Sequence, residues 1–259
     1  MPTTQSLTRS KSDLRNILRF TLLTGMLASF ITGCKKDSIR DIDTDPDQIT
    51  PISLSDIIYF TVNGKVYTSN TVWSAGVGNS GVNMKFLDAP VTGMKSWGTV
   101  RGKSYYSPVD SIYFHYQKTF SNGNDNYKVS FGKGFHVRDM SYAGTMFFPK
   151  DIRSMLAKGE QKFATDYQSF NAIDGFWFAS DRLGSTGVPE YSFEDPATYP
   201  QADAHFEITK KEQIDQNSYR IEARFEMNLY DAEHQKNRVT NGFLRLTVYR
   251  EWWGTVLFN

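Results

Sequence analysis

The side chains best suited to chemistry lie in and beside one segment, residues 181–202. It directly follows the aromatic run at residues 175–178 and is the longest stretch without hydrophobic periodicity. Long irregular insertions in compact domains are often functional. The candidate ligand-binding residues combine aromatic rings with charged groups: Trp177, Arg182, Glu190, Tyr191, Glu194 and Tyr199. Because a sugar ring stacks on aromatic side chains while its hydroxyls bond to carboxylates, this pattern is typical of a glycan site.

The same residues allow two other interpretations. Glu190 with Glu194 or Asp195 would form an acid and base pair for glycoside cleavage if their carboxyl groups lay about 5 to 10 Å apart. Alternatively, Trp177 belongs to the core, the tyrosines anchor the segment, and the acids are solvated. The sequence leaves these alternatives open, so we assign no catalytic residue.

Other chemical motifs are weak. The spacing Gly76-x-Gly78-x-x-Gly81 matches a dinucleotide-binding loop, but residues 82–86 alternate like a strand where a helix is needed, so we expect a flexible loop there. The chain has no G-x-S-x-G motif, and its four histidines are scattered singly. We therefore assign neither a cofactor nor a metal.

Cys34 is the only cysteine of the chain. Basic residues at positions 9–19 precede an apolar run at 20–31, which is much shorter than the roughly 20 residues of a membrane-spanning helix. The quartet Ile31-Thr32-Gly33-Cys34 resembles the lipobox of bacterial lipoproteins, in which the cysteine is acylated and becomes residue 1. This resemblance implies that residues 1–33 are a removed signal peptide and that lipid on Cys34, palmitate included, holds the protein on a membrane. Under the sorting rule of enteric bacterial lipoproteins, which the resemblance brings with it, Lys35 in place of aspartate implies the outer membrane, on its periplasmic or surface face.

Charge and cysteine content exclude other classes. The whole chain has a formal net charge of +1, and residues 1–33 contain four basic residues and one acidic residue, so the remainder carries about −2. This balance argues against a nucleic-acid partner. A single cysteine excludes an intramolecular disulfide.

Residues 34–53 are polar and lack apolar periodicity, as expected for a flexible tether. Residues 54–259 read as a single β-rich domain. Asn63-Gly64 between residues 56–62 and 65–68 predicts a hairpin, because both central residues of a type I′ turn need positive φ. A second hairpin is expected around residues 121–125, and residues 219–229 alternate with one face in the core and one in water.

One short helix is predicted over residues 151–162, where Asp151 caps and Gly159 terminates. The sequence thus predicts an all-β, mainly antiparallel fold, a β-sandwich or flattened barrel with one short helix.

Residues 60–67 (FTVNGKVY) and 239–246 (VTNGFLRL), with the lipobox, resemble uncharacterised small lipoproteins of Bacteroidota. The resemblance covers the two ends of the chain and implies only an envelope address and a β architecture. The sequence therefore favours a membrane-anchored envelope lipoprotein that binds a glycan or a partner without catalysis. The alternatives are a structural or assembly subunit of an envelope complex and, less favoured, a glycoside hydrolase.

Overall fold

The computed structural model describes residues 55–100, 102–165, 174–189, 194–252 and 255–256. All of them belong to the second of the two units into which the chain divides, Ser53–Asn259. The predictions for the signal peptide, Cys34 and the tether lie outside these residues.

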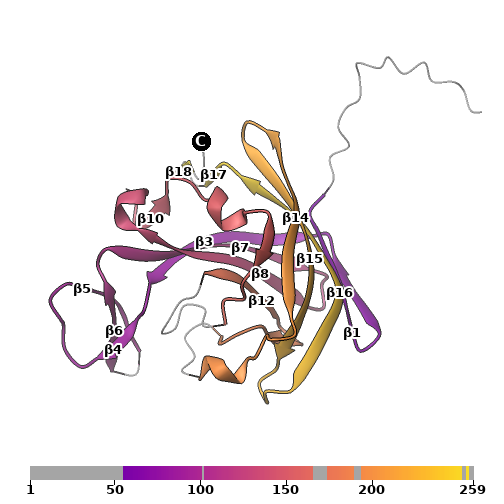
Figure 1. Cartoon of the computed structure of the whole chain (residues 1–259), viewed down its shortest axis with the longest axis horizontal. Helices are drawn as coiled ribbons and strands as arrows, with labels where there is room; N and C mark the ends of the chain where they lie inside the picture. Colours follow the sequence, from indigo (N-terminus) through magenta and orange to yellow (C-terminus); the bar gives the residue numbers. More distant parts are fainter. Residues whose placement is uncertain (1–54, 101, 166–173, 190–193, 253–254, 257–259) are drawn as a thin grey trace, which may run out of the picture. The chain divides into compact units, whose positions relative to one another are not determined.

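The described chain is all-β and mainly antiparallel, as the sequence predicts, and its largest element is one curled sheet of eleven strands (Figure 1). Nine strands follow one another across it: β2 (Lys65–Ser69), β1 (Ile57–Val62), β16 (Lys236–Tyr249), β15 (Ser218–Tyr230), β13 (Gly184–Ser185), β12 (Gly175–Ser180), β8 (Asn126–His136), β7 (Ser111–Ser121) and β3 (Val72–Gly81). Two more lie off this path: β14 (His205–Asp215) pairs with β15, and β11 (Gly159–Gln161) pairs with β14.

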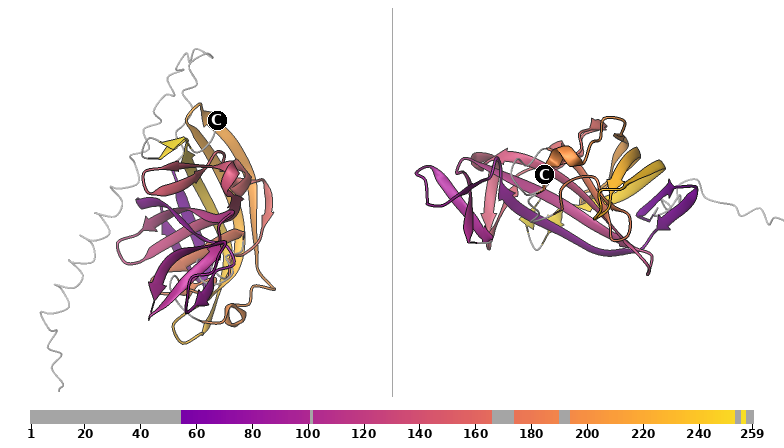
Figure 2. Two further views of the ribbon diagram at one scale, coloured as in Figure 1. Left: turned by 90° about the vertical axis from the view of Figure 1, so that its left-hand side faces the viewer. Right: turned by 90° about the horizontal axis from the view of Figure 1, so that it is seen from below.

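The sheet folds into two facing layers, which gives it the form of a half-barrel (Figure 2). Strands β14, β15, β16, β1 and β2 form one layer, and β12, β8, β7 and β3 form the other. On one side the layers are joined through β13, which pairs with β15 at the single position Ser185–Tyr230. On the other side the edge strands β2 and β3 follow each other in the chain, separated only by Asn70 and Thr71.

Aromatic side chains fill the space between the layers. The ring of Phe176 on β12 stacks on that of Phe206 on β14 with centroids 3.8 Å apart, and Phe60 on β1 meets the edges of Tyr127 and Phe178. All five side chains are fully buried. Burying large aromatic surfaces in this way supplies much of the driving force for folding.

Both predicted hairpins are confirmed. β1 and β2 pair around Asn63 and Gly64, which have φ of 50° and 75° as a type I′ turn requires. β7 and β8 pair over eleven positions, from Ser111–His136 to Ser121–Asn126.

The predicted polar face of residues 219–229 is wrong at two positions. Arg220 and Asn228 are buried although their neighbours Ile221, Ala223 and Phe225 form the core face. Asn228 is covered because its side-chain amide donates to the carboxylate of Asp203, so the chain before β14 folds over it.

The predicted helix over residues 151–162 is also wrong. Asp151 does accept from the backbone N–H of Arg153, but only the 3-10 turn η2 (Arg153–Leu156) forms. Ala157 is already extended, and Gly159 has φ of 110°, which starts β11. A single turn is sufficient to bury Met155 and Leu156.

The glycine motif at Gly76, Gly78 and Gly81 lies within β3 and pairs with β7, so the expected flexible loop is wrong. The glycines allow close packing: a Cβ at Gly78 would lie 2.1 Å from the imidazole of His115.

The remaining elements form small sheets and single turns. β4 (Lys85–Leu87), β6 (Lys103–Pro108) and β5 (Met94–Val100) form a three-stranded sheet; β9 (Met140–Ala143) pairs with β10 (Met146–Pro149), and β17 (Glu251–Trp252) with β18 (Thr255–Val256). The 3-10 turns η1 (Val137–Asp139) and η3 (Pro196–Thr198) complete the list. Among the described residues, no helix has the length and apolar character to span a membrane.

Candidate functional site

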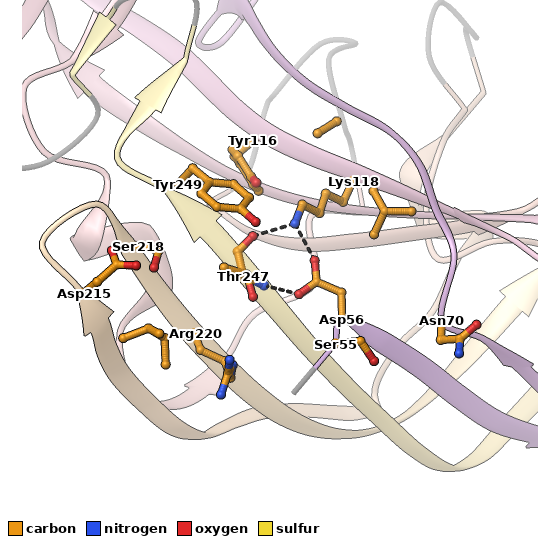
Figure 3. Close-up of a pocket in the computed structure, with 13 residues that line it drawn as sticks. Ser55, Asp56, Asn70, Tyr116, Lys118, Asp215, Ser218, Arg220, Thr247 and Tyr249 are labelled. Carbon is orange, nitrogen blue, oxygen red and sulfur yellow. Dashed lines mark hydrogen bonds and ion pairs between the residues drawn. The ribbon is translucent and has the colours of Figure 1, made fainter. Parts of the chain in front are cut away.

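A pocket of about 680 Å³ opens where the two layers separate (Figure 3). One layer contributes the entry to β1, the β14–β15 hairpin and the end of β16, and the other contributes β3 and β7. Its polar lining includes the side chains of Ser55, Asp56, Asn70, Lys118, Arg220 and Tyr249. The volume lies within the range of about 300–1,000 Å³ that small-molecule sites occupy.

A buried ion pair forms the floor of this pocket. The Nζ of Lys118 donates to Oδ2 of Asp56 at 2.5 Å and to the carbonyl of Thr247 at 2.6 Å. The other carboxylate oxygen of Asp56 accepts from the backbone N–H of Thr247 at 2.7 Å. Pairing between β1 and β16 ends at Ile57–Arg245, so these two side chains satisfy backbone groups of β16 that lie beyond the ladder. The pair is therefore structural, and both oxygens of Asp56 are already engaged.

Two tyrosines border the ion pair and differ in exposure. Tyr116 on β7 is buried, and burial, with the nearby charge of Asp56, raises the pKa of its phenol well above the usual value. Tyr249 at the end of β16 is 58% exposed, and its ring centroid lies 5.6 Å from Nζ of Lys118. Tyr249 thus offers an aromatic surface to a ligand, whereas Tyr116 stays a neutral part of the wall.

Arg220 on β15 is a buried cation in the pocket lining. Its guanidinium lies 3.5 Å from a carboxylate oxygen of Glu212, which makes a shorter contact of 2.6 Å with Lys210. The Nε of Arg220 has no hydrogen-bond partner among the described residues. Ser55, Asn70 and the Tyr249 hydroxyl likewise make no side-chain hydrogen bond within the described part of the chain. Because Ser55, Asn70 and Tyr249 are exposed, their side chains are donors and acceptors that a polar ligand can reach, whereas the Nε of Arg220 is buried.

Trp177 does not offer the exposed ring on which a sugar would stack. It lies on β12 with 4% of its surface exposed and packs with Tyr113 and Ala164. The Nζ of Lys128 lies 6.0 Å from its ring centroid. This side chain is part of a buried cluster on the outer side of β12.

Residues 194–203 fold onto the β15–β16 end of the sheet. Tyr199 is buried, donates its hydroxyl to Glu194 and meets the ring of Tyr230 edge-on. Burial and the Glu194 carboxylate raise the pKa of Tyr199. Asp195 caps η3 by accepting from the backbone N–H of Ala197. These contacts anchor the segment.

The other predicted site residues divide in two groups. Arg182 is exposed, and its backbone N–H donates to Ser180. Glu190 and Tyr191 lie outside the described residues, and so does the predicted pairing of Glu190 with Glu194 or Asp195. The structure does not bring the described members together around the 680 Å³ pocket.

Sequence patterns do not reveal most of the pocket residues, because their neighbours in the sequence do not distinguish them from other polar residues. Lys118 is the exception: it falls on the apolar face of β7, in register with Phe114, Tyr116 and Phe120. A lysine at a core-facing position needs a buried partner, and that requirement points to a polar site. Asp56 and Arg220 join Lys118 in the pocket lining only through the pairing of distant strands.

Comparisons with protein-family models, with curated proteins and with solved structures find no match to this chain. The geometry of the site therefore carries the functional argument.

Proposed function

We propose that the protein is a lipoprotein of the bacterial cell envelope, anchored through lipid on Cys34, whose β domain binds a small polar ligand of the glycan class without catalysis. The pocket between the two layers is the binding site. The observation that carries this proposal is a pocket of about 680 Å³ with an exposed tyrosine ring, a buried arginine and unengaged hydroxyl and amide groups.

The chemistry of the lining favours a polyhydroxylated ligand. The Tyr249 ring can pack against the apolar face of a pyranose, while the exposed side chains of Ser55 and Asn70 bond to hydroxyl groups. The charges of Asp56 and Lys118 compensate each other, and the guanidinium of Arg220 lies 3.5 Å from the carboxylate of Glu212, so both cations of the lining have a carboxylate partner. The engaged carboxylate of Asp56 also argues for binding over acid–base catalysis.

Binding is tested with the detergent-solubilised full chain against a panel of mono- and oligosaccharides by isothermal titration calorimetry. We expect Tyr249→Ala to weaken binding of a retained sugar by roughly tenfold, the effect of about 1.4 kcal/mol. Tyr142→Ala is the matched control, because Tyr142 on β9 is similarly exposed at 63% and does not line the pocket. Equal affinities of the two variants for the sugar would show that the pocket is not the binding site.

The anchor is tested separately. Cys34→Ala should abolish incorporation of radiolabelled palmitate and release the protein from the membrane fraction, while Ser53→Ala should leave both unchanged. A Cys34→Ala protein that is still acylated and membrane-bound would contradict the lipoprotein assignment.

One observation favours the alternative of an assembly subunit. Among the described strands β3 pairs only with β7, its ten residues contain neither a charged residue nor proline, and its bulge is confined to its first residues, at Trp73. Edge strands without such protection readily accept a further strand from a partner. A photocrosslinker at Ala75 should capture an envelope protein in intact cells if this alternative holds, and only intramolecular products if it does not.

A further inference from the structure

A second pocket of about 580 Å³ adjoins the first at Asn70, which lines both. It lies around the link between β2 and β3 and the β7–β8 turn. None of the residues that line it is ionisable, and its polar side chains include those of Ser69, Asn70, Thr71 and Asn122 beside the indole of Trp73. Hydroxyls, amides and one indole are the groups that recognise an uncharged polyol.

Trp73 is the most informative of these residues because it is 72% exposed. The pairing of β3 with β7 shifts register between Val72 and Ser74, so Trp73 is the extra residue of a β-bulge. A bulge re-aims a side chain out of the regular alternation of a strand. Exposing an indole costs hydrophobic free energy that folding would otherwise gain. A ligand that covered this ring would recover that free energy.

The polar groups around Trp73 divide into engaged and available ones. Ser69 donates its hydroxyl to the carbonyl of Ser121 at 2.7 Å, and Asn122 donates to the hydroxyl of Tyr127 at 2.7 Å, so both hold the turn in place. The side chains of Asn70 and Thr71 are exposed and make no hydrogen bond within the described residues. The pocket thus presents an exposed aromatic ring together with the amide of Asn70 and the hydroxyl of Thr71.

We propose that this second pocket is a subsite for a neutral pyranose unit that stacks on Trp73, and that the ligand of the protein is an uncharged oligosaccharide extending past Asn70 from one pocket to the other. This inference rests on the proposed function and specifies its ligand class. Nucleotides and acidic sugars fit the second pocket less well because its lining offers no cation to compensate their charge.

The experiment titrates the detergent-solubilised full chain with neutral malto-, cello-, manno- and xylo-oligosaccharides of one to six units. The parent, Trp73→Ala, Trp73→Phe and Tyr249→Ala are compared, with Tyr142→Ala as the control for loss of an exposed aromatic side chain. In the series that binds, affinity for the parent should rise with chain length. Trp73→Ala should lose that rise, with a loss of about tenfold at six units, and keep the affinity for the shortest ligand. Trp73→Phe should recover most of the rise because it retains a stacking surface.

The outcomes separate this inference from the function on which it rests. If Tyr249→Ala weakens binding while Trp73→Ala matches the parent at every length, the first pocket binds the ligand and the subsite is refuted. If Trp73→Ala weakens the binding of long and short ligands equally, the two pockets are not subsites for one oligosaccharide. If no series binds the parent, both the glycan function and the subsite are rejected.

Discussion

Removing the carboxylate of Asp56 should destabilise the domain strongly. The side chains of Lys118 and Asp56 are 5% and 11% exposed, so Asp56→Ala leaves a buried ammonium without its counter-ion. It also leaves the backbone N–H of Thr247 without its acceptor. Breaking a buried ion pair from one side costs about 3–5 kcal/mol. For a domain of this size that corresponds to a fall in Tm of roughly 6–20 °C.

The assay is urea unfolding of fragment 36–259 followed by circular dichroism, with Asp56→Ala, Lys118→Met and the double variant compared. Replacing both partners removes the unpaired charge, so the double variant should be more stable than Asp56→Ala alone. Asp215→Ala is a suitable control, because Asp215 lines the same pocket but is exposed at the tip of the β14–β15 hairpin. A change below about 0.5 kcal/mol for Asp56→Ala, the range of ordinary surface substitutions, would refute the structural role of the pair.

Three further changes test other parts of the structure. Gly78→Ala should destabilise by about 1–3 kcal/mol through overlap with the His115 ring, whereas Gly76→Ala on the same strand meets nothing within 4 Å and should be nearly neutral in urea titrations; equal effects would contradict the packing. Burial, with Lys128 nearby, lowers the pKa of His115 from 6.5 to about 4. As the pH is lowered, the unfolded chain therefore takes up this proton at a higher pH than the folded chain does. The free energy of unfolding should fall by up to about 1.4 kcal/mol for each pH unit from pH 6.5 down to pH 4. His115→Gln should flatten this dependence in urea titrations across that range. Trp177→Ala should lower the free energy of unfolding by about 3–5 kcal/mol, while the affinity of the folded protein for sugar stays unchanged. If Trp177→Ala instead loses affinity without losing stability, the binding site lies at residues 181–202.

Local patterns predicted the strands because their causes are local. Asn63-Gly64 forces a tight turn, and the alternation at residues 219–229 matches the two faces of a strand. The same dipeptide at Asn241-Gly242 forms no hairpin turn: it lies inside β16 at a shift of register, where Gly242 makes room for the ring of Phe225. There a glycine serves packing from a neighbouring strand, and a single strand's sequence does not contain that information.

The candidate site could not be predicted from local patterns, because pairings between distant strands bring its residues together. Asp56, Lys118 and Thr247 meet because β1, β7 and β16 converge, and only the lysine on an apolar face signals this in advance. The segment at residues 181–202 lacked periodicity for a different reason. Its described part is held by side-chain bonds such as Tyr199 to Glu194 and Gln201 to the backbone of Asn228, which need no regular spacing.

A polar ligand that binds in the pocket between the two layers should perturb the backbone that borders the pocket. The most direct measurement is the set of backbone amide shift changes in NMR spectra of ¹⁵N-labelled fragment 36–259 during titration with a bound oligosaccharide. We predict that the largest changes fall at residues 55–57, 70–75 and 247–249, which border the pocket. Changes concentrated at residues 174–189 and 194–202 instead would contradict the assignment of the pocket as the binding site.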